Sequence, residues 1–122
     1  MKRDMDLVRG MLLAIENDVL RFGEGTENGG LDAPDDVIEA HLRLLEQAGL
    51  VEVMFRPQRG AIQVRGLTWE GHDLLDTVRD PEVWKRTKEG ASKMGGWTFA
   101  LLKDLGTAYL KHVAKERLGL DL

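Results

Sequence analysis

A short stretch of alternating residues between two helical segments limits most strongly how this chain of 122 residues can fold. Val51, Val53 and Phe55 stand at every second position, and a similar alternation returns at residues 62–65 and ends in Leu67. The connection at residues 56–60 contains a proline and a glycine, which suit a tight turn. The pattern predicts a two-stranded β-hairpin over residues 51–67.

Helical periodicity flanks the hairpin on both sides. Apolar residues recur every three or four positions in five segments, namely residues 4–19, 34–48, 69–79, 81–93 and 97–118. Asp4, Thr68 and Asp80 each stand where a side chain can accept hydrogen bonds from the free N–H groups of a helix start. The glycine-rich residues 21–34 interrupt the pattern and are expected to form a loop, with room for a short extended piece at residues 19–22.

This order of elements is the layout of a winged helix, in a chain that is mainly α with a small β-hairpin (α+β). In that fold the helix before the hairpin can enter the major groove of DNA, and the hairpin, or wing, contacts backbone phosphates. We therefore expect a winged-helix-like domain over residues 1–93 and a C-terminal helical extension over residues 94–122. The glycine-rich loop stands where the second helix of a helix-turn-helix would be.

Several motifs connect the chain with a known family. Residues 1–9 read MKRDMDLVR, residues 41–50 read HLRLLEQAGL, and residues 67–76 read LTWEGHDLLD, followed by RD at 79–80 and VW at 83–84. Together they resemble a domain family of unknown function found in small bacterial and bacteriophage proteins. The resemblance implies a winged-helix-like domain with a C-terminal helical extension in a phage or prophage setting, and it implies no catalytic residue.

The composition excludes several classes of function. The chain has no cysteine, which rules out disulfides, iron–sulfur clusters and thiol catalysis. Its formal net charge of −4 excludes a strongly basic nucleic-acid coat protein. No apolar run approaches the ~18 residues needed to cross a bilayer, and the mixed charge of residues 1–6 is unlike a signal peptide. A cytoplasmic localisation without a membrane partner is the expectation.

Catalysis is not expected from the titratable residues. His41, His72 and His112 fall on three different predicted helices, and none has the spacing of a metal-ligand pair. His72 and Asp76, four positions apart, are interpreted as a surface pair on one helix, and His41 as a partly buried packing residue. We expect a protein that is not an enzyme and that has no catalytic residue, cofactor or metal site.

The predicted DNA contacts lie on the hairpin and on the helix before it. Arg56, Arg59 and Arg65 are positioned to contact backbone phosphates, and Arg43 and Gln47 to face the groove. Four basic residues of the next-to-last helix extend this surface: Lys85, Arg86, Lys88 and Lys93. The groove helix suits phosphate poorly, because four carboxylates accompany its single arginine. We predict a phage-related protein associated with double-stranded DNA, of the transcription-regulator type.

A protein-interaction or dimerisation module with an acidic face and no DNA partner is the alternative. The last predicted helix has a wide apolar face. The chain also carries aromatic residues of the kind enriched in interfaces, namely Trp84, Trp97, Phe99 and Tyr109. This face either forms a homodimer or folds back on the first helix of the same chain. Trp69 and Trp84 are predicted to be core residues at the helix junction rather than residues that stack on nucleobases.

Overall fold

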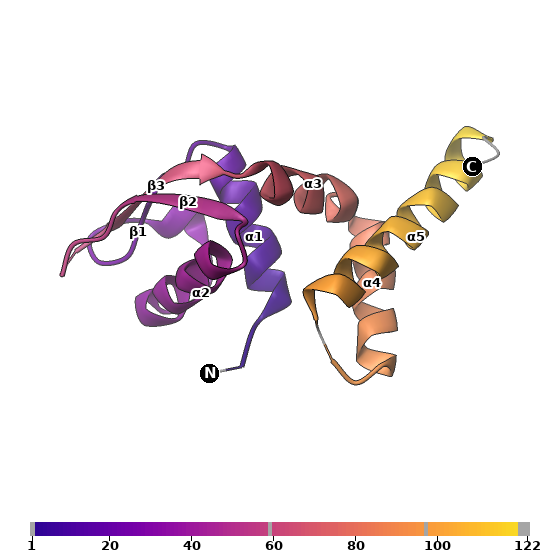
Figure 1. Cartoon of the computed structure of the whole chain (residues 1–122), viewed down its shortest axis with the longest axis horizontal. Helices are drawn as coiled ribbons and strands as arrows, with labels where there is room; N and C mark the ends of the chain where they lie inside the picture. Colours follow the sequence, from indigo (N-terminus) through magenta and orange to yellow (C-terminus); the bar gives the residue numbers. More distant parts are fainter. Residues whose placement is uncertain (1, 59, 97, 120–122) are drawn as a thin grey trace. The chain divides into compact units, whose positions relative to one another are not determined.

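Five α-helices and a small antiparallel sheet make up the computed structural model, which describes residues 2–58, 60–96 and 98–119 (Figure 1). The predicted class, mainly α with a small β part, is thereby confirmed. In chain order the elements are α1 (Met5–Glu16), β1 (Arg21–Phe22), the 3-10 turn η1 (Asn28–Gly30), α2 (Asp35–Gln47), β2 (Val51–Phe55), β3 (Ile62–Leu67), α3 (Trp69–Val78), α4 (Pro81–Lys93) and α5 (Phe99–Leu118).

The chain divides into two compact units, Met1–Asp73 and Leu74–Leu122. The first contains the sheet with α1 and α2, and the second contains α4 and α5. The sequence pattern placed a boundary after residue 93, at a pair of glycines. These glycines follow the end of α4, but α5 then packs against α4 within one unit. A helix break therefore does not coincide with a division between compact units.

The sheet of the first unit has three strands in the order β1-β3-β2, all antiparallel. The predicted hairpin is present, with Val51 opposite Leu67, and β1 adds a third strand in which Phe22 lies opposite Ile62. Phe22 is fully buried, so burial of one aromatic ring accounts for a strand of only two residues. Helices α1 and α2 contact the sheet and each other (Figure 1).

The core of the first unit follows from the predicted periodicities. Buried side chains recur at helical spacing in α1 and α2 and at alternate positions in the strands. Its apolar members are Leu7, Val8, Met11, Leu12, Ala14, Ile15, Phe22, Ile38, Leu42, Leu45, Leu50, Val51, Ile62 and Val64.

The glycine-rich loop between β1 and α2 is organised by one buried residue, Asn28. Its Oδ1 accepts hydrogen bonds from the Gly23 N–H (2.8 Å) and from the Thr26 hydroxyl (2.7 Å). Its Nδ2 donates to the Asp35 carboxylate (2.6 Å) at the start of α2. Asn28 has φ +51°, a left-handed conformation that asparagine tolerates better than most residues. A 3-10 turn built around Asn28 therefore stands where a helix-turn-helix would have its second helix.

The start of α3 fits closely against the end of α2. The Thr68 hydroxyl accepts from the Gly71 N–H (3.1 Å) and donates to the Gly49 carbonyl, which confirms the predicted cap. A β-carbon at Gly71 would lie 2.1 Å from the Leu50 carbonyl oxygen, closer than any side chain allows. The Thr-x-x-Gly spacing of the motif is therefore a packing requirement.

In the second unit α4 and α5 form a helical hairpin. Asp80 caps α4 by accepting from the Glu82 N–H (2.9 Å) and the Val83 N–H (3.2 Å), as predicted. Gly106 of α5 is buried, and a β-carbon there would lie 2.8 Å from Thr77 Cγ2. The covering of α5 by α4 in the same chain was not among the arrangements expected from the sequence.

The two tryptophans predicted to be core residues differ. Trp84 is 6% exposed and belongs to the core, whereas Trp69 is 80% exposed, so the prediction for Trp69 was wrong. Trp69 is the first residue of α3, and Gly71, two positions later, occupies the buried face. Two helical positions are about 200° apart around the axis, so the Trp69 ring points away from that face. Trp97 lies outside the described residues.

Candidate nucleic-acid interface

The outer face of α2 carries the two residues predicted to face a DNA groove. Arg43 and Gln47 are both exposed and lie four positions apart, so they share one side of the helix. The opposite side is buried and includes Leu42 and Leu45. In the part of the chain that the structure describes, no ion pair joins Arg43 to a carboxylate.

His41 holds α2 to the start of α1. Its ring is fully buried, Nε2 accepts from the Asp4 N–H (2.9 Å), and Nδ1 donates to the Val37 carbonyl (2.8 Å). This pattern assigns the neutral tautomer with the proton on Nδ1. The interpretation of His41 as a packing residue is confirmed, and its hydrogen bonds add that it fixes the position of α2.

The described arginines of the wing both face carboxylates. Arg56, just after β2, forms an ion pair with Glu46 in the last turn of α2. Arg65, on β3, lies 3.9 Å from the Glu52 carboxylate on β2. Arg59, the third predicted phosphate contact, lies outside the described residues. Two of the three proposed contacts therefore start from a partly neutralised state.

Arg43 of α2 and Arg56 of the wing, distant in sequence, face the same hollow of about 190 Å³. We call it the wing hollow. It is lined by Glu24, Glu39, Arg43, Arg56, Pro57, Gln58, Gly60 and Ile62. The structure thus brings the predicted groove helix and the predicted wing to one surface, but it places two carboxylates there as well.

Part of the acidity of α2 has a structural explanation. Asp35 and Asp36 lie in its first turn, where the helix dipole favours negative charge, and Pro34 at the N-cap supplies no capping side chain. Asp35 also accepts the hydrogen bond from Asn28. The carboxylates that bear on DNA binding are therefore Glu39 and Glu46, further along the helix.

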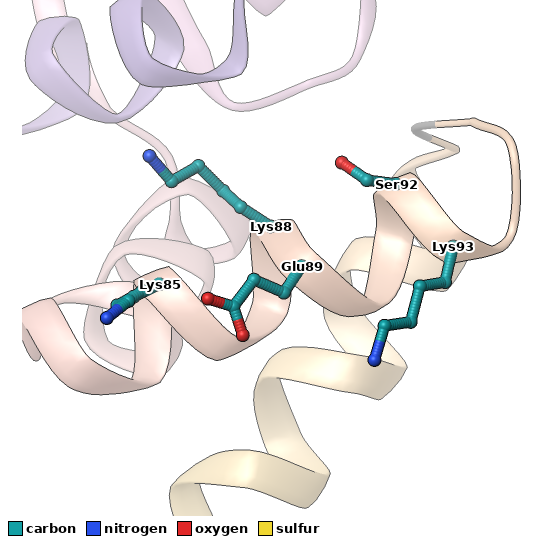
Figure 2. A pocket seen from close by; sticks show the side chains of 5 residues that line it. All are labelled: Lys85, Lys88, Glu89, Ser92 and Lys93. Carbon is teal, nitrogen blue, oxygen red and sulfur yellow. The ribbon is translucent and has the colours of Figure 1, made fainter.

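Helix α4 of the second unit carries a separate group of lysines. Lys85, Lys88 and Lys93, with Glu89 and Ser92, line an open hollow of about 550 Å³ (Figure 2). Figure 2 shows these side chains spread along α4, with those of Lys88 and Lys93 extending in different directions. The Lys88 Nζ lies 5.8 Å from the centre of the Trp84 ring, a cation–π arrangement. Three cations against one carboxylate make this the more basic of the two hollows.

Arg86, the fourth basic residue predicted on this helix, has a different setting. It forms an ion pair with Glu82 (2.9 Å) one turn earlier and lies 4.0 Å from Glu116 of α5. Arg117 of α5 pairs with Asp80 and with Glu82 (3.1 Å). The hydrogen bonds from Arg117 and from the Val83 N–H hold the pKa of Asp80 below its ordinary value of 3.8.

Within the described ranges, no group of three or more histidine, aspartate or glutamate side chains is arranged to hold a metal ion. Asp76, which was predicted to pair with His72, accepts instead from Arg79 (2.8 Å). His112 lies 2.9 Å from the Glu116 carboxylate. None of the described helices is both long enough and apolar enough to span a bilayer.

Sequence reasoning missed two features of this region. The first is the pairing of Arg56 with Glu46, ten positions earlier, on the other side of the turn between α2 and β2. The second is the exposure of Met54 (56%) and Phe55 (57%) on β2. The alternating pattern signalled a strand, but it could not indicate that the apolar side chains at the strand end lie beyond the core.

Comparisons with known proteins give two matches. Residues 2–97 match the family described as "Hypothetical protein (DUF2513)". An "Uncharacterized protein" of Haemophilus influenzae is 34% identical to the chain over 90 residues, which is 72% of this chain and 76% of that protein. No solved structure matches. The family match includes both α2 and the wing.

Proposed function

This chain belongs to the DUF2513 family of hypothetical proteins, and we propose that it is a non-enzymatic protein that associates with double-stranded DNA through α2 and the wing. Membership of a domain family of unknown function is what the motifs implied. In the proposed complex Arg43 and Gln47 face the groove, while Arg56, Arg59 and Arg65 contact backbone phosphates. A regulatory role, in the phage setting that the resemblance implies, is part of the same proposal.

The observation that carries the proposal is the wing hollow. It joins an arginine of the helix before the hairpin to an arginine of the hairpin itself, although 13 positions separate Arg43 from Arg56. The strand order β1-β3-β2 supports it, because β3 lies between the other two strands and ties β1, before α2, to the hairpin after α2. A base-reading helix and a phosphate-contacting wing need this adjacency to act on one duplex.

Fluorescence anisotropy with labelled duplex DNA at low and moderate salt tests the proposal. The triple variant R56A/R59A/R65A should bind at least tenfold more weakly than the wild type, because each phosphate contact contributes counterion release. A matched control, K103A/K111A/K115A, removes the same number of positive charges from α5. If the wild type does not bind at low salt, or the two triple variants bind alike, DNA binding through the wing is refuted.

Base readout needs a separate experiment, because random duplexes report only on phosphate contacts. Selection of bound fragments from genomic DNA should enrich a common sequence with the wild type. The variant R43A/Q47A should lose that enrichment while keeping most of its affinity for random DNA. Equal enrichment by both proteins would refute groove contact by α2.

A protein-binding function without DNA is the second candidate, and the exposure of Trp69 favours it. A tryptophan that is 80% exposed is unusual on a free surface and is typical of residues that dominate protein interfaces. Affinity capture from the native host with wild type and with Trp69→Ser tests this function. A partner retained by the wild type and lost by the variant supports it, and equal recovery contradicts it.

The homodimer through the C-terminal helix is a related proposal. Helix α5 buries Leu102, Gly106 and Val113 in its own unit, and Phe99 and Leu118 stay exposed at its two ends. Light scattering of the full chain at tens of micromolar tests the dimer, and a monomeric mass excludes it. The full chain is preferable to a truncation after residue 93, which would uncover the side of α4 that packs on α5.

A further inference from the structure

We infer that Glu46, in the last turn of α2, limits the affinity of the wing for duplex DNA of any sequence, because its carboxylate competes with DNA phosphate for Arg56. This inference rests on the proposed function. It assigns a role to one of the carboxylates that make α2 unlike an ordinary DNA-reading helix. It does not depend on the position of the second unit.

The geometry of the pair supports this role. Glu46 lies in the last turn of α2, the chain reverses through Gly49, and Arg56 follows the end of β2. The ion pair between Arg56 and Glu46 therefore bridges the predicted groove helix and the part of the wing that follows β2. Asn28 fixes the start of α2 and His41 fixes its middle through their own hydrogen bonds, so the bridge is not the only connection that positions this helix.

The exposure of the pair makes it displaceable. The side chains of Arg56 and Glu46 retain 40% and 37% of their accessible surface. Partly exposed ion pairs are weak and screened by salt, so a phosphate arriving at the guanidinium can replace the carboxylate. Each binding event then loses one ion pair as it gains one phosphate contact. The net gain from Arg56 is smaller than that of a free arginine.

The consequence is a lower affinity for duplex DNA of every sequence. Phosphate contacts are present on every duplex, whereas base contacts by Arg43 and Gln47 depend on sequence. Weakening a phosphate contact lowers the affinity for all duplexes by the same factor, so stable binding then requires the base contacts in addition. Glu39 faces the same hollow, but no ion pair joins it to an arginine in the described ranges, so Glu46 is the residue that holds Arg56.

The test replaces the carboxylate by its neutral isostere. With random duplex DNA as the probe, Glu46→Gln should bind roughly threefold to tenfold more tightly than the wild type. The slope of log K against log salt should become steeper by about one, because Arg56 then releases one additional counterion. In a protein that already carries R56A, the substitution E46Q should cause neither change, so that E46Q/R56A binds DNA like R56A alone.

A matched control separates this role from a general change in charge. Glu70→Gln raises the net charge by the same amount at an exposed position on α3, and it should leave the salt slope unchanged. Glu46→Asp keeps the charge and should bind more like the wild type than Glu46→Gln does. Thermal unfolding of each variant shows whether the fold is retained, and a merely structural role for Glu46 would change unfolding without changing the slope.

The outcomes are distinct. A tighter, more salt-dependent Glu46→Gln whose gain disappears in E46Q/R56A supports the inference. If Glu46→Gln behaves like Glu70→Gln while the wild type binds DNA, the inference is overturned and the proposed function stands. A gain that persists in E46Q/R56A overturns it as well. If neither the wild type nor Glu46→Gln binds duplex DNA at low salt, both the inference and the proposed function are refuted.

Discussion

The two compact units use their ion pairs differently. In the second unit Arg117 joins the end of α5 to Asp80 and Glu82 at the start of α4, and Arg86 extends the group to Glu116. These pairs hold two helices together and leave the lysines of α4 at the surface. In the first unit the pair of Arg56 with Glu46 lies at the proposed binding surface itself.

The difference teaches that segment charge is a poor guide to binding. Residues 51–67 contain three arginines and one glutamate, yet both described arginines face carboxylates, one of them supplied by α2. Three lysines of α4 line one hollow with a single carboxylate, although that helix was predicted only to extend the surface. What a cationic side chain can contribute to the binding of phosphate depends on the residue that the fold places beside it.

The largest expected effect on stability comes from the close packing of the start of α3 against the end of α2 in the first unit. In Gly71→Val the new β-carbon would lie 2.1 Å from the Leu50 carbonyl oxygen, which is backbone and cannot move aside. We expect the free energy of unfolding to fall by about 3 kcal/mol or more. Urea denaturation followed by circular dichroism measures it.

The control for this prediction is Gly96→Ala in the connection between α4 and α5. A β-carbon at Gly96 meets no atom within 4 Å. This variant should change stability by about 0.5 kcal/mol or less. Similar stability losses in the two variants would show that the approach of α3 to the end of α2 is looser than described.

The next prediction compares two tryptophans, one from each unit. Trp84→Ala should destabilise the protein by about 3–5 kcal/mol, because it empties a buried site in the second unit. Trp69→Ala should change stability by about 0.5 kcal/mol or less, because its ring is mostly in solvent. Chemical denaturation of both variants measures the two losses of stability. Equal losses would contradict the exposed position of Trp69.

A smaller loss of stability is expected from His41→Ala. The substitution removes the acceptor of the Asp4 N–H and leaves a cavity beside α2, which should cost about 2 kcal/mol. Amide hydrogen exchange should also quicken at the start of α1. His72→Ala, at an exposed position, is the control and should change neither quantity. Unchanged exchange in His41→Ala would contradict the link between α2 and α1.

The smallest effect concerns pH and the second unit. The folded pKa of Asp80 is lower than its unfolded value, chiefly because of Arg117. Ionised Asp80 therefore stabilises the unit above about pH 4, and this contribution is lost as the pH falls through the folded pKa. Arg117→Ala should raise the pKa of Asp80 toward 3.8 and reduce the loss of stability in acid. An NMR titration of the carboxyl group measures the shift.

The control for the pH prediction is Arg79→Ala, which removes the partner of Asp76 and leaves Arg117 in place. The pKa of Asp80 should not change in this variant. A shift of equal size in both variants would indicate a general effect of charge on the second unit and would contradict a specific hydrogen bond from Arg117.

Features that depend on neighbours in sequence were predicted well. The caps at Asp4, Thr68 and Asp80 are all present, because each uses N–H groups two or three residues away. Gly49 has the positive φ (+75°) expected of a residue that ends a helix. The hairpin was found because its alternation and its turn residues lie within one short stretch.

By itself, the sequence determined the helices, the hairpin, their order and the mainly α class with a small β part. Only the tertiary structure decided that β1 joins the sheet, that α5 packs on α4, that Trp69 is exposed, and that Glu46 holds Arg56. The physical reason is the distance along the sequence between the residues that interact. Caps, turns and periodicity are properties of consecutive residues, whereas a strand pairing, a helix partner or an ion pair requires segments that the folding of the whole unit brings together.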